Sequence, residues 1–306
     1  MKAPRFGSLA VAAVLASLFL AQCSIVQQGA GVLSDAGKIS EKDKDSIIKT
    51  SEAVRSTFSE ITEQEEYYIG RAVSALILSR YKVLGNSGLT DYVNVCGKTV
   101  SYSSDRPETF GGYHFLVLDT EEVNALAAPG GFIFVTKGLL DRCKDEEMLA
   151  SILAHEIGHV SAKHGLQSIK KSRLIDAFKV LGKEAATRYG SKELAELTGI
   201  FENVLGDIVE SLVEKGYDRK YEYEADKLGA KYAAATGYDP NGLARFLKTM
   251  TGGPAAGGAK GWFKTHPSAE DRLGKVNDQI KGMGAVPKTQ GVRTARFLQA
   301  AKGLKP

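Results

Sequence analysis

The chain is poor in the side chains that most often bind transition metals, and its charges nearly cancel. It has five histidines and three cysteines among 306 residues, so a metal site must be built from few candidates. Its 40 basic and 36 acidic side chains give no large excess of either sign, which argues against nucleic-acid binding. Beyond residue 21, no apolar run is long enough to span a bilayer. The composition therefore directs attention to a small set of polar residues.

The one markedly apolar segment lies at the amino terminus. Lys2 and Arg5 precede the apolar run 9–21, which is too short for a comfortable membrane span and is typical of a secretory signal. Residues 1–22 are therefore predicted to be a signal peptide. Without them, 38 basic and 36 acidic side chains remain, and the protein is nearly neutral.

The predicted signal ends in the sequence Leu-Ala-Gln-Cys, which resembles the lipobox of bacterial lipoproteins. Such proteins are cut before the cysteine that carries the lipid, so Cys23 is the predicted lipidation site. Gln22 departs from the usual Gly, Ala or Ser, and a conventional cleaved signal peptide is the alternative. Ser24 resembles the outer-membrane sorting pattern of Gram-negative lipoproteins. We therefore expect a periplasmic protein that a lipid anchors to the outer membrane.

The other two cysteines, Cys96 and Cys143, leave two interpretations open. An oxidising periplasm permits a disulfide between them. Buried free thiols fit the sequence equally well. The spacing supports neither a cysteine zinc site nor a nucleophilic role for Cys143.

Two histidines four residues apart enclose a glutamate. On a helix with about 3.6 residues per turn, His155 and His159 lie about 40° apart around the axis and about 6 Å apart along it, so both rings can reach one ion. Glu156 projects beside them, toward the water that such an ion would activate. This pattern is typical of a zinc site with its own general base. The alternative is a surface helix that carries these residues by chance.

Residues 145–164 are predicted to form the helix that carries this pattern. Three acidic residues at its start suit the positive end of the helix dipole. The apolar residues that follow at helical spacing are Met148, Leu149, Ile152, Leu153, Ile157 and Val160. A helix of this composition places Glu156 and both histidines in an interior cleft, where water is scarce and charges act strongly.

The residues directly after His159 do not supply a third ligand, although catalytic zinc usually has three. A metzincin would need Gly at 162 and His at 165, where this chain has Ala162 and Gly165. His164 lies about 140° around the helix from His159. We therefore expect His164 to be an ordinary polar residue at the helix end.

A second acidic pair is the better source of a third ligand. Glu222 and Asp226 are four residues apart, on one face of a predicted helix. Glu222 is predicted to bind zinc, and Asp226 to accept a hydrogen bond from the second nitrogen of a ligand imidazole. Taken alone, such an acidic run is more typical of a solvated helix face, and Glu224 is expected to be only that.

Four motifs in this order resemble the CAAX-prenyl-protease-like zinc metallopeptidases, peptidase family M48, and specifically their soluble bacterial envelope branch. The resemblance covers roughly residues 61–278. The motifs are residues 124–140, 155–159, 222–226, and 265–267 followed by Arg272. Because no apolar run beyond residue 21 is long enough to cross a bilayer, we do not expect this chain to process prenylated proteins inside a membrane, as integral-membrane members of the family do.

The resemblance implies one Zn2+ per chain, bound by His155, His159 and Glu222, with Glu156 as general base for peptide-bond hydrolysis. It also implies a role for His266, because the His-Pro loop of similar proteins can lie near the metal. His266 would then either act in catalysis by stabilising the oxyanion, or occupy the open metal position and keep the enzyme latent. Taken alone, His266 followed by proline is more typical of a turn.

Residues 113–119 and 131–136 are predicted to be two strands of a small sheet. The segment 124–131 that joins them is expected to line the cleft. A strand edge beside the metal would bind an extended polypeptide through its main chain. The alternative is an ordinary hairpin that turns at residues 129–131. The predicted substrate-binding residues are Asn124, Ala125, Pro129 and Gly130.

The order of predicted elements indicates an α+β fold, a mainly helical zincin-type (gluzincin) metallopeptidase domain with a small β-sheet beside the active-site helix. Segment 166–215 is predicted to be mostly helical and to fold back over the cleft, and residues 251–261 to form a flexible loop. The predicted organisation is a lipoprotein-type signal peptide at 1–22, a tether and N-terminal segment at 23–60, the metallopeptidase domain at 61–283, and a C-terminal tail at 284–306.

Two functions fit these features. The first is a zinc endopeptidase of the bacterial cell envelope that hydrolyses misfolded or misassembled proteins. The second is a latent or non-enzymatic assembly factor that binds unfolded envelope proteins in the same cleft. Glu156 favours the first, because a protein that only binds has no need of a general base beside the metal.

Overall fold

The computed structural model describes residues 61–168, 206, 208–251, 265–266, 269–283, 289–302 and 304. The chain divides into two units, Met1–Ile61 and Thr62–Pro306, and the described fold belongs to the second. The predicted signal peptide, Cys23, the tether, the loop at 251–261 apart from its first residue, and most of segment 166–215 lie outside the described residues.

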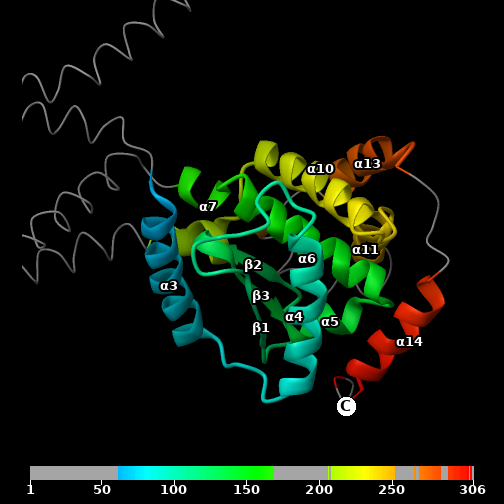
Figure 1. The fold of residues 1–306 in the computed structure, drawn as a ribbon, viewed down its shortest axis with the longest axis horizontal. Coiled ribbons are helices and arrows are strands. Elements are labelled where there is room, and N and C mark those ends of the chain that lie inside the picture. The colour runs from blue at the N-terminus through cyan, green and yellow to red at the C-terminus, as the bar shows by residue number, and fades with distance from the viewer. Residues whose placement is uncertain are drawn as a thin grey trace, which may run out of the picture. The chain divides into compact units, whose positions relative to one another are not determined.

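Helices surround a small sheet of three strands (Figure 1). This is the mainly helical fold with a small sheet that the sequence predicted. None of the helices within the described ranges has the length and apolar character needed to cross a bilayer. The helices and strands are α3 Glu63–Arg80, α4 Ser87–Ser101, β1 His114–Leu118, β2 Ala125–Ala128, β3 Phe132–Thr136, α5 Lys137–Arg142, α6 Glu146–Ser161, α7 His164–Gln167, a π-helical turn Glu210–Lys215, α10 Arg219–Ala235, α11 Gly242–Thr251, α13 Ala269–Ile280 and α14 Gln290–Ala300.

The sheet has the strand order β1-β3-β2, with β1 parallel and β2 antiparallel to β3. Strands β1 and β3 confirm the two predicted strands. The third strand, β2, lies inside the segment that was expected to be only a connection. Its alanines have low strand propensity, but pairing with β3 and complete burial make it a strand. The chain then turns at Pro129–Gly131, where Gly130 and Gly131 have φ values of 76° and 98°, as in the hairpin alternative.

The predicted active-site helix is α6, and it begins where its acidic start predicted. The Asp145 side chain caps it by accepting a hydrogen bond of 2.8 Å from the Met148 amide. Every residue from 146 to 160 is buried. The helix ends at Ser161, short of the predicted end, because Lys163 adopts a left-handed conformation with φ 55°. The chain therefore turns before His164.

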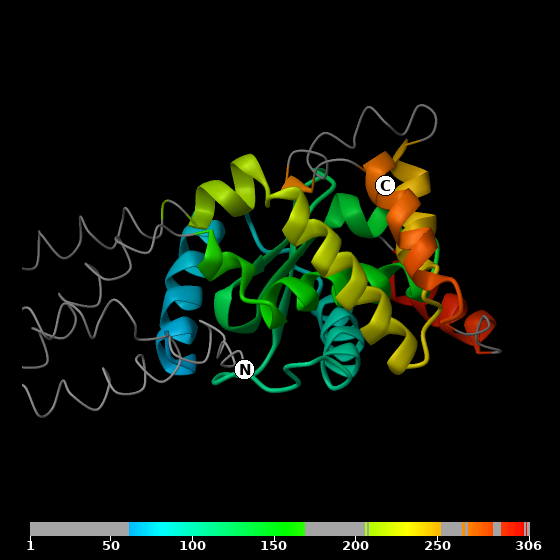
Figure 2. The same ribbon diagram turned by 90° about the horizontal axis from the view of Figure 1, so that it is seen from above.

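Two glycines allow α6 and α10 to lie in close contact. A Cβ atom on Gly158 would lie 3.0 Å from the Ala225 carbonyl oxygen, and one on Gly229 would lie 2.9 Å from the His155 amide nitrogen. Figure 2 shows α10 running alongside the green helices that include α6, with α13 next to α11. This contact brings the acidic residues of α10 to the histidines of α6.

The two cysteines of the described residues are free and buried, so the possible Cys96–Cys143 disulfide is not formed. Cys96 lies on α4 and faces Tyr92 and Glu146, and burial raises the pKa of its thiol to about 12. Cys143 lies elsewhere in the core, at the end of α5, and burial raises its pKa as well. Neither thiol is therefore readily ionised, and Cys143 packs as a small apolar group.

The predicted C-terminal tail does not separate from the domain. Its helix α14 contacts α6 and α4. Phe297 and Leu304 belong to the main hydrophobic core and are 1% and 3% exposed. Spaced apolar residues in a short polar segment gave too weak a pattern to predict this packing.

Truncating Phe297 tests whether α14 is part of the fold. Phe297→Ala removes a buried ring and leaves a cavity, so we expect the free energy of unfolding to fall by about 3–5 kcal/mol in urea titrations. Leu298→Ala is the matched control, because Leu298 is 54% exposed and should change it by less than about 0.5 kcal/mol. Equal small effects of the two variants would mean that α14 is a dispensable tail.

Candidate metal and catalytic site

Four buried side chains from three parts of the chain meet beside β2. His155 and His159 come from α6, Glu222 from α10, and His266 from the segment before α13. Within the described residues, one candidate ligand atom from each of the four lies within 4.8 Å of the others. The structure thus brings together the three ligands implied by the resemblance, and adds His266 to them.

The Nε2 atoms of the two α6 histidines face the same point. They lie 3.1 Å apart, and Glu222 reaches them with one oxygen each, at 3.6 Å from His155 and 3.4 Å from His159. His266 joins through Nδ1, which is 3.1 Å from both Glu222 oxygens. All four side chains therefore direct electron-pair donors inward, as a metal site requires.

The Nδ1 atoms of the two α6 histidines point away from this centre, and each has a partner. Asp226 Oδ1 lies 2.9 Å from His155 Nδ1, at the position predicted for it. His164 Nδ1 lies 2.9 Å from His159 Nδ1. These outer contacts fix the ring orientations that aim both Nε2 atoms at one point.

The expectation that His164 is an ordinary polar residue at a helix end is wrong. Its side chain is fully buried, and its Nε2 lies 3.3 Å from Glu224 Oε2. Glu224, expected to be only a solvated residue, is half exposed but bonded to this ring. The prediction failed because it assumed a continuous helix, whereas the turn at Lys163 brings His164 back to His159.

Arg272 of α13 neutralises part of the buried acidity. Its guanidinium lies 2.9 Å from a Glu222 oxygen and donates two hydrogen bonds, of 2.6 and 2.9 Å, to Asp226. Burial alone would raise the pKa of Glu222, but electrostatic interactions with His266 and Arg272 and hydrogen bonds with His155 and His159 hold it well below the usual range. The pKa of Asp226 is lowered against burial in the same way, chiefly by Arg272. Both groups are therefore ionised. The sequence offered Arg272 only as part of a motif, with no role.

The pKa values of the two α6 histidines are shifted in opposite directions. Burial and Arg272 act to lower the pKa of His155, but hydrogen bonds to Asp226 and Glu222 outweigh them and raise it to about 9. Burial lowers the pKa of His159 well below the usual value, against the opposing effect of Glu222. A metal that binds at neutral pH must therefore displace a proton from the His155 ring.

Glu156 is the buried carboxyl without a hydrogen-bond partner at this site. Neither of its oxygens accepts a hydrogen bond within the part of the chain that the structure describes. The nearest histidine atom is Nε2 of His266, at 3.6 Å. Burial raises the pKa of Glu156, and the nearby histidines only partly oppose this shift. A raised pKa suits a group that must take up a proton near neutral pH.

The residues of this site fit a divalent metal. Two imidazoles and a carboxylate are the donor set of many catalytic zinc ions. With Glu156, Glu222 and Asp226 ionised, Arg272 cancels one of three buried negative charges, and a divalent cation would cancel the other two. The uncompensated Glu156 oxygens lie beside the cluster, where a water molecule would need a proton acceptor.

A family model described as "Peptidase family M48" matches residues 89–280, which include all four clustered side chains and Arg272. The chain belongs to peptidase family M48. The M48 assignment confirms the family that the sequence motifs resembled.

Relatives of this M48 chain carry peptidase names. It is 31% identical over 158 residues to the mitochondrial metalloendopeptidase OMA1 of Schizosaccharomyces pombe. The aligned region covers 51% of this chain and 43% of that protein. It is 26% identical over 201 residues to the beta-barrel assembly-enhancing protease of Escherichia coli, or 64% of this chain and 39% of that one. The metalloprotease YcaL of Escherichia coli is 27% identical over 247 residues, 80% and 83% of the two chains.

The chain thus spans less than half the length of the first two of these relatives. The family and the names of these relatives support a metalloendopeptidase with a metal-dependent site.

Strand β2 forms one edge of the sheet in this M48 domain, next to the four clustered side chains. Other residues of the chain cover this edge. The main-chain groups of β2 alternate in direction, and the Thr136 amide of β3 donates to the Asn124 carbonyl, so the carbonyls of Ala125 and Ala127 point away from β3. His266 Nε2 lies 3.4 Å from the Ala125 carbonyl oxygen, and the Tyr217 hydroxyl donates to that of Ala127 at 3.4 Å. The Tyr217 ring also stacks on His159 with centroids 4.3 Å apart.

The two covering residues are held to each other and to the sheet. The Tyr217 amide donates to the Thr265 carbonyl at 3.3 Å, and the Thr265 hydroxyl donates to Asn124 Oδ1 at 2.8 Å. Of the predicted substrate-binding residues, Asn124 therefore holds the cover in place. Tyr217 could not be identified from the sequence, because an isolated tyrosine before a charged helix has no distinguishing pattern.

The other two predicted substrate-binding residues lie farther along the hairpin. Pro129 lines a small hollow together with His159 and Leu166. The Gly130 amide donates to Glu66 Oε1 at 3.0 Å, so it is already used within the fold. Gly130 is therefore placed to fix the turn against α3 rather than to bind a peptide.

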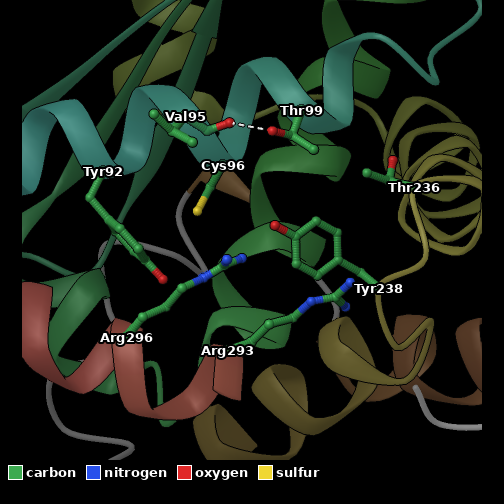
Figure 3. Close-up of a pocket in the computed structure, with 8 residues that line it drawn as sticks. All are labelled: Tyr92, Val95, Cys96, Thr99, Thr236, Tyr238, Arg293 and Arg296. Atoms are coloured by element: carbon green, nitrogen blue, oxygen red, sulfur yellow. Dashed lines mark hydrogen bonds between the residues drawn. The ribbon is translucent and has the colours of Figure 1, made fainter. Parts of the chain in front are cut away.

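A second hollow, of about 350 Å³, lies between α4, α14 and the turn after α10 (Figure 3). Figure 3 shows the Cys96 sulfur directed into it, with two tyrosines and two arginines around it. Three of these, Tyr92, Tyr238 and Arg296, bond to the buried Glu146 at the start of α6. The hollow is thus lined by the residues that hold Glu146 at the start of α6, and it is separate from the four metal-binding side chains.

Removing the Arg272 charge tests its role in balancing the site. Arg272→Leu leaves Glu222 and Asp226 buried without their cation, so we expect the free energy of unfolding to drop by about 3–5 kcal/mol in chelator-treated protein. Arg219→Leu is the control, because its pair with Asp271 is exposed and should be worth less than about 1 kcal/mol. A similar loss in both variants would contradict the charge-balancing role.

Proposed function

We propose that this chain is a zinc-dependent endopeptidase of the bacterial cell envelope that hydrolyses misfolded or misassembled proteins. The proposal is carried by the buried Glu156 carboxyl, which accepts no hydrogen bond from the described residues and lies beside a cluster of side chains that can bind a metal. His155, His159 and Glu222 would hold the ion. The chemistry that zinc supplies when bound is Lewis-acid activation of water and of the scissile carbonyl group.

Glu156 would accept the proton of the attacking water and pass it to the nitrogen of the leaving amine. Its raised pKa keeps the protonated form accessible for this second step. Asp226 and Arg272 would hold the His155 ring and the Glu222 carboxylate in place while this transfer occurs.

The edge of β2 supports an extended peptide as substrate. Its outward carbonyls, at Ala125 and Ala127, lie beside the cluster, and a peptide that pairs there is held through its main chain irrespective of most side chains. Folded domains seldom offer such a strand, because their sheet edges are kept short, charged or covered. This mode of binding therefore favours unfolded or misassembled proteins.

The proposed location rests on the amino terminus and on the relatives. The signal-like segment with Cys23 favours a lipid-anchored periplasmic protein, and the name beta-barrel assembly-enhancing protease is compatible with the envelope. Misassembled envelope proteins would then be the substrates that this chain meets.

His266 supports a latent form of the same enzyme. With His266 included, four protein side chains could bind the ion, and a site with four protein ligands is typical of closed sites that leave no position for water. The same ring contacts the β2 carbonyl that a peptide would use. We therefore propose that His266 is a latch in this arrangement, and that it must move before catalysis.

Replacing the general base tests the chemistry. We expect Glu156→Gln to lower the rate of casein cleavage by about 100- to 10,000-fold, because the amide cannot accept the proton. Zinc content, measured by mass spectrometry, should stay near one ion per chain in this variant and be lost in Glu222→Ala and His159→Ala. Glu270→Gln, an exposed change on α13, is the control. Undiminished cleavage by Glu156→Gln would refute the mechanism.

Releasing the latch tests the proposed latency. His266→Ala should increase casein cleavage several-fold at unchanged zinc content, because it opens both the metal position and the β2 edge. Thr265→Val, which removes the hydrogen bond to Asn124 but keeps His266, should act in the same direction. A zinc-loaded His266→Ala variant with reduced cleavage would instead assign His266 to catalysis.

A further inference from the structure

The two histidines of α6 are supported in different ways. His155 has a carboxylate partner at Nδ1, and that carboxylate is bound to Arg272. His159 has a second imidazole as its partner, and that imidazole is bound to Glu224. The first chain of contacts is entirely buried, whereas the second runs from the cluster to a side chain that is 55% exposed.

The hydrogen-bond directions along the second chain are fixed by the role of His159. If Nε2 of His159 binds the metal, its proton must be on Nδ1, which then donates to His164 Nδ1 at 2.9 Å. His164 in turn must carry its own proton on Nε2, which faces Glu224 Oε2 at 3.3 Å. All three groups are satisfied in this one arrangement.

A strained backbone conformation at Lys163 holds His164 in this arrangement. Lys163 is the one non-glycine residue with positive φ among those that the structure describes, and such a conformation is unfavourable for a side chain with a Cβ atom. The turn at Lys163 reverses the chain after α6 and brings the His164 ring into contact with the His159 ring. The Tyr221 ring then packs against His164, with centroids 4.5 Å apart.

We propose that His164 is a positioning residue for the metal ligand His159, and that Glu224 is its anchor at the surface. The proposal rests on the proposed function, because it takes His159 to be a zinc ligand. Partners of this kind hold a ligand ring in its binding tautomer and typically contribute about 10- to 100-fold in metal affinity.

The test measures the zinc dissociation constant of the purified full chain by competition with a chromogenic chelator. His164→Leu should weaken zinc binding by about 10- to 100-fold, because His159 loses its acceptor. His164→Asn should restore most of the affinity, since its amide oxygen can accept from His159 Nδ1. A role in packing alone predicts no rescue by asparagine.

The exposed anchor gives a second variant that leaves the core intact. Glu224→Ala should weaken zinc binding measurably, and should have no further effect when combined with His164→Leu, because the chain of hydrogen bonds is then already broken. Glu270→Ala, on an exposed part of α13, should leave the affinity unchanged. If His164→Leu does not fold, His164→Asn and Glu224→Ala decide the question.

Two results would overturn the inference in distinguishable ways. Wild-type affinity in both His164→Leu and Glu224→Ala would refute the positioning role and leave the proposed function intact. Absence of zinc binding by the wild type, or its persistence in His159→Ala, would refute the proposed function and the inference with it. As a spectroscopic check, the visible bands of the cobalt-substituted protein should shift in His164→Leu, because the His159 ring is no longer held.

Discussion

The close contact between α6 and α10 is the constraint on which the site depends. Gly158 and Gly229 leave room for the backbone of the opposite helix, because a Cβ atom at Gly229 would clash with the backbone of α6 and one at Gly158 would crowd the backbone of α10. At this separation Glu222 reaches both histidines and Asp226 reaches the outer nitrogen of one of them. A wider separation of the two helices would lengthen each of these contacts at once. The geometry of the site is thus set by backbone packing before any ion binds.

That contact also creates an electrostatic problem, which a third helix solves. Three carboxyls and several imidazoles lie together where water is excluded, and burying unpaired charge is costly. Arg272 enters from α13 and bonds to two of the carboxylates. Glu156 is left without such a partner. The fold therefore stabilises the carboxylates that are proposed to stay fixed and leaves unpaired the carboxyl that is proposed to exchange a proton.

Sequence reasoning predicted the parts of this site that depend on regular periodicity. The spacing of His155 and His159 and the apolar pattern around them suffice to predict α6, and the family resemblance pointed to Glu222. It failed where tertiary packing decides. Strand β2 is made of residues with little strand propensity, α14 is held by the buried Phe297 ring and by two arginines that bond to the start of α6, and His164 depends on one strained residue. No local pattern distinguishes these three from a loop, a tail and a helix end.

If substrates pair with β2 as proposed, the covered edge of this strand would turn substrate binding into a competition within the molecule. An extended chain that pairs with this edge must first displace Tyr217 and His266 from its carbonyls. Its apparent affinity is then the intrinsic affinity multiplied by the fraction of molecules with an open edge. If about one molecule in a hundred were open, binding would be weakened about a hundredfold. Short or weakly pairing peptides would be rejected, whereas long unfolded chains with many points of attachment could still compete, so the cover would then act as a filter on substrate length.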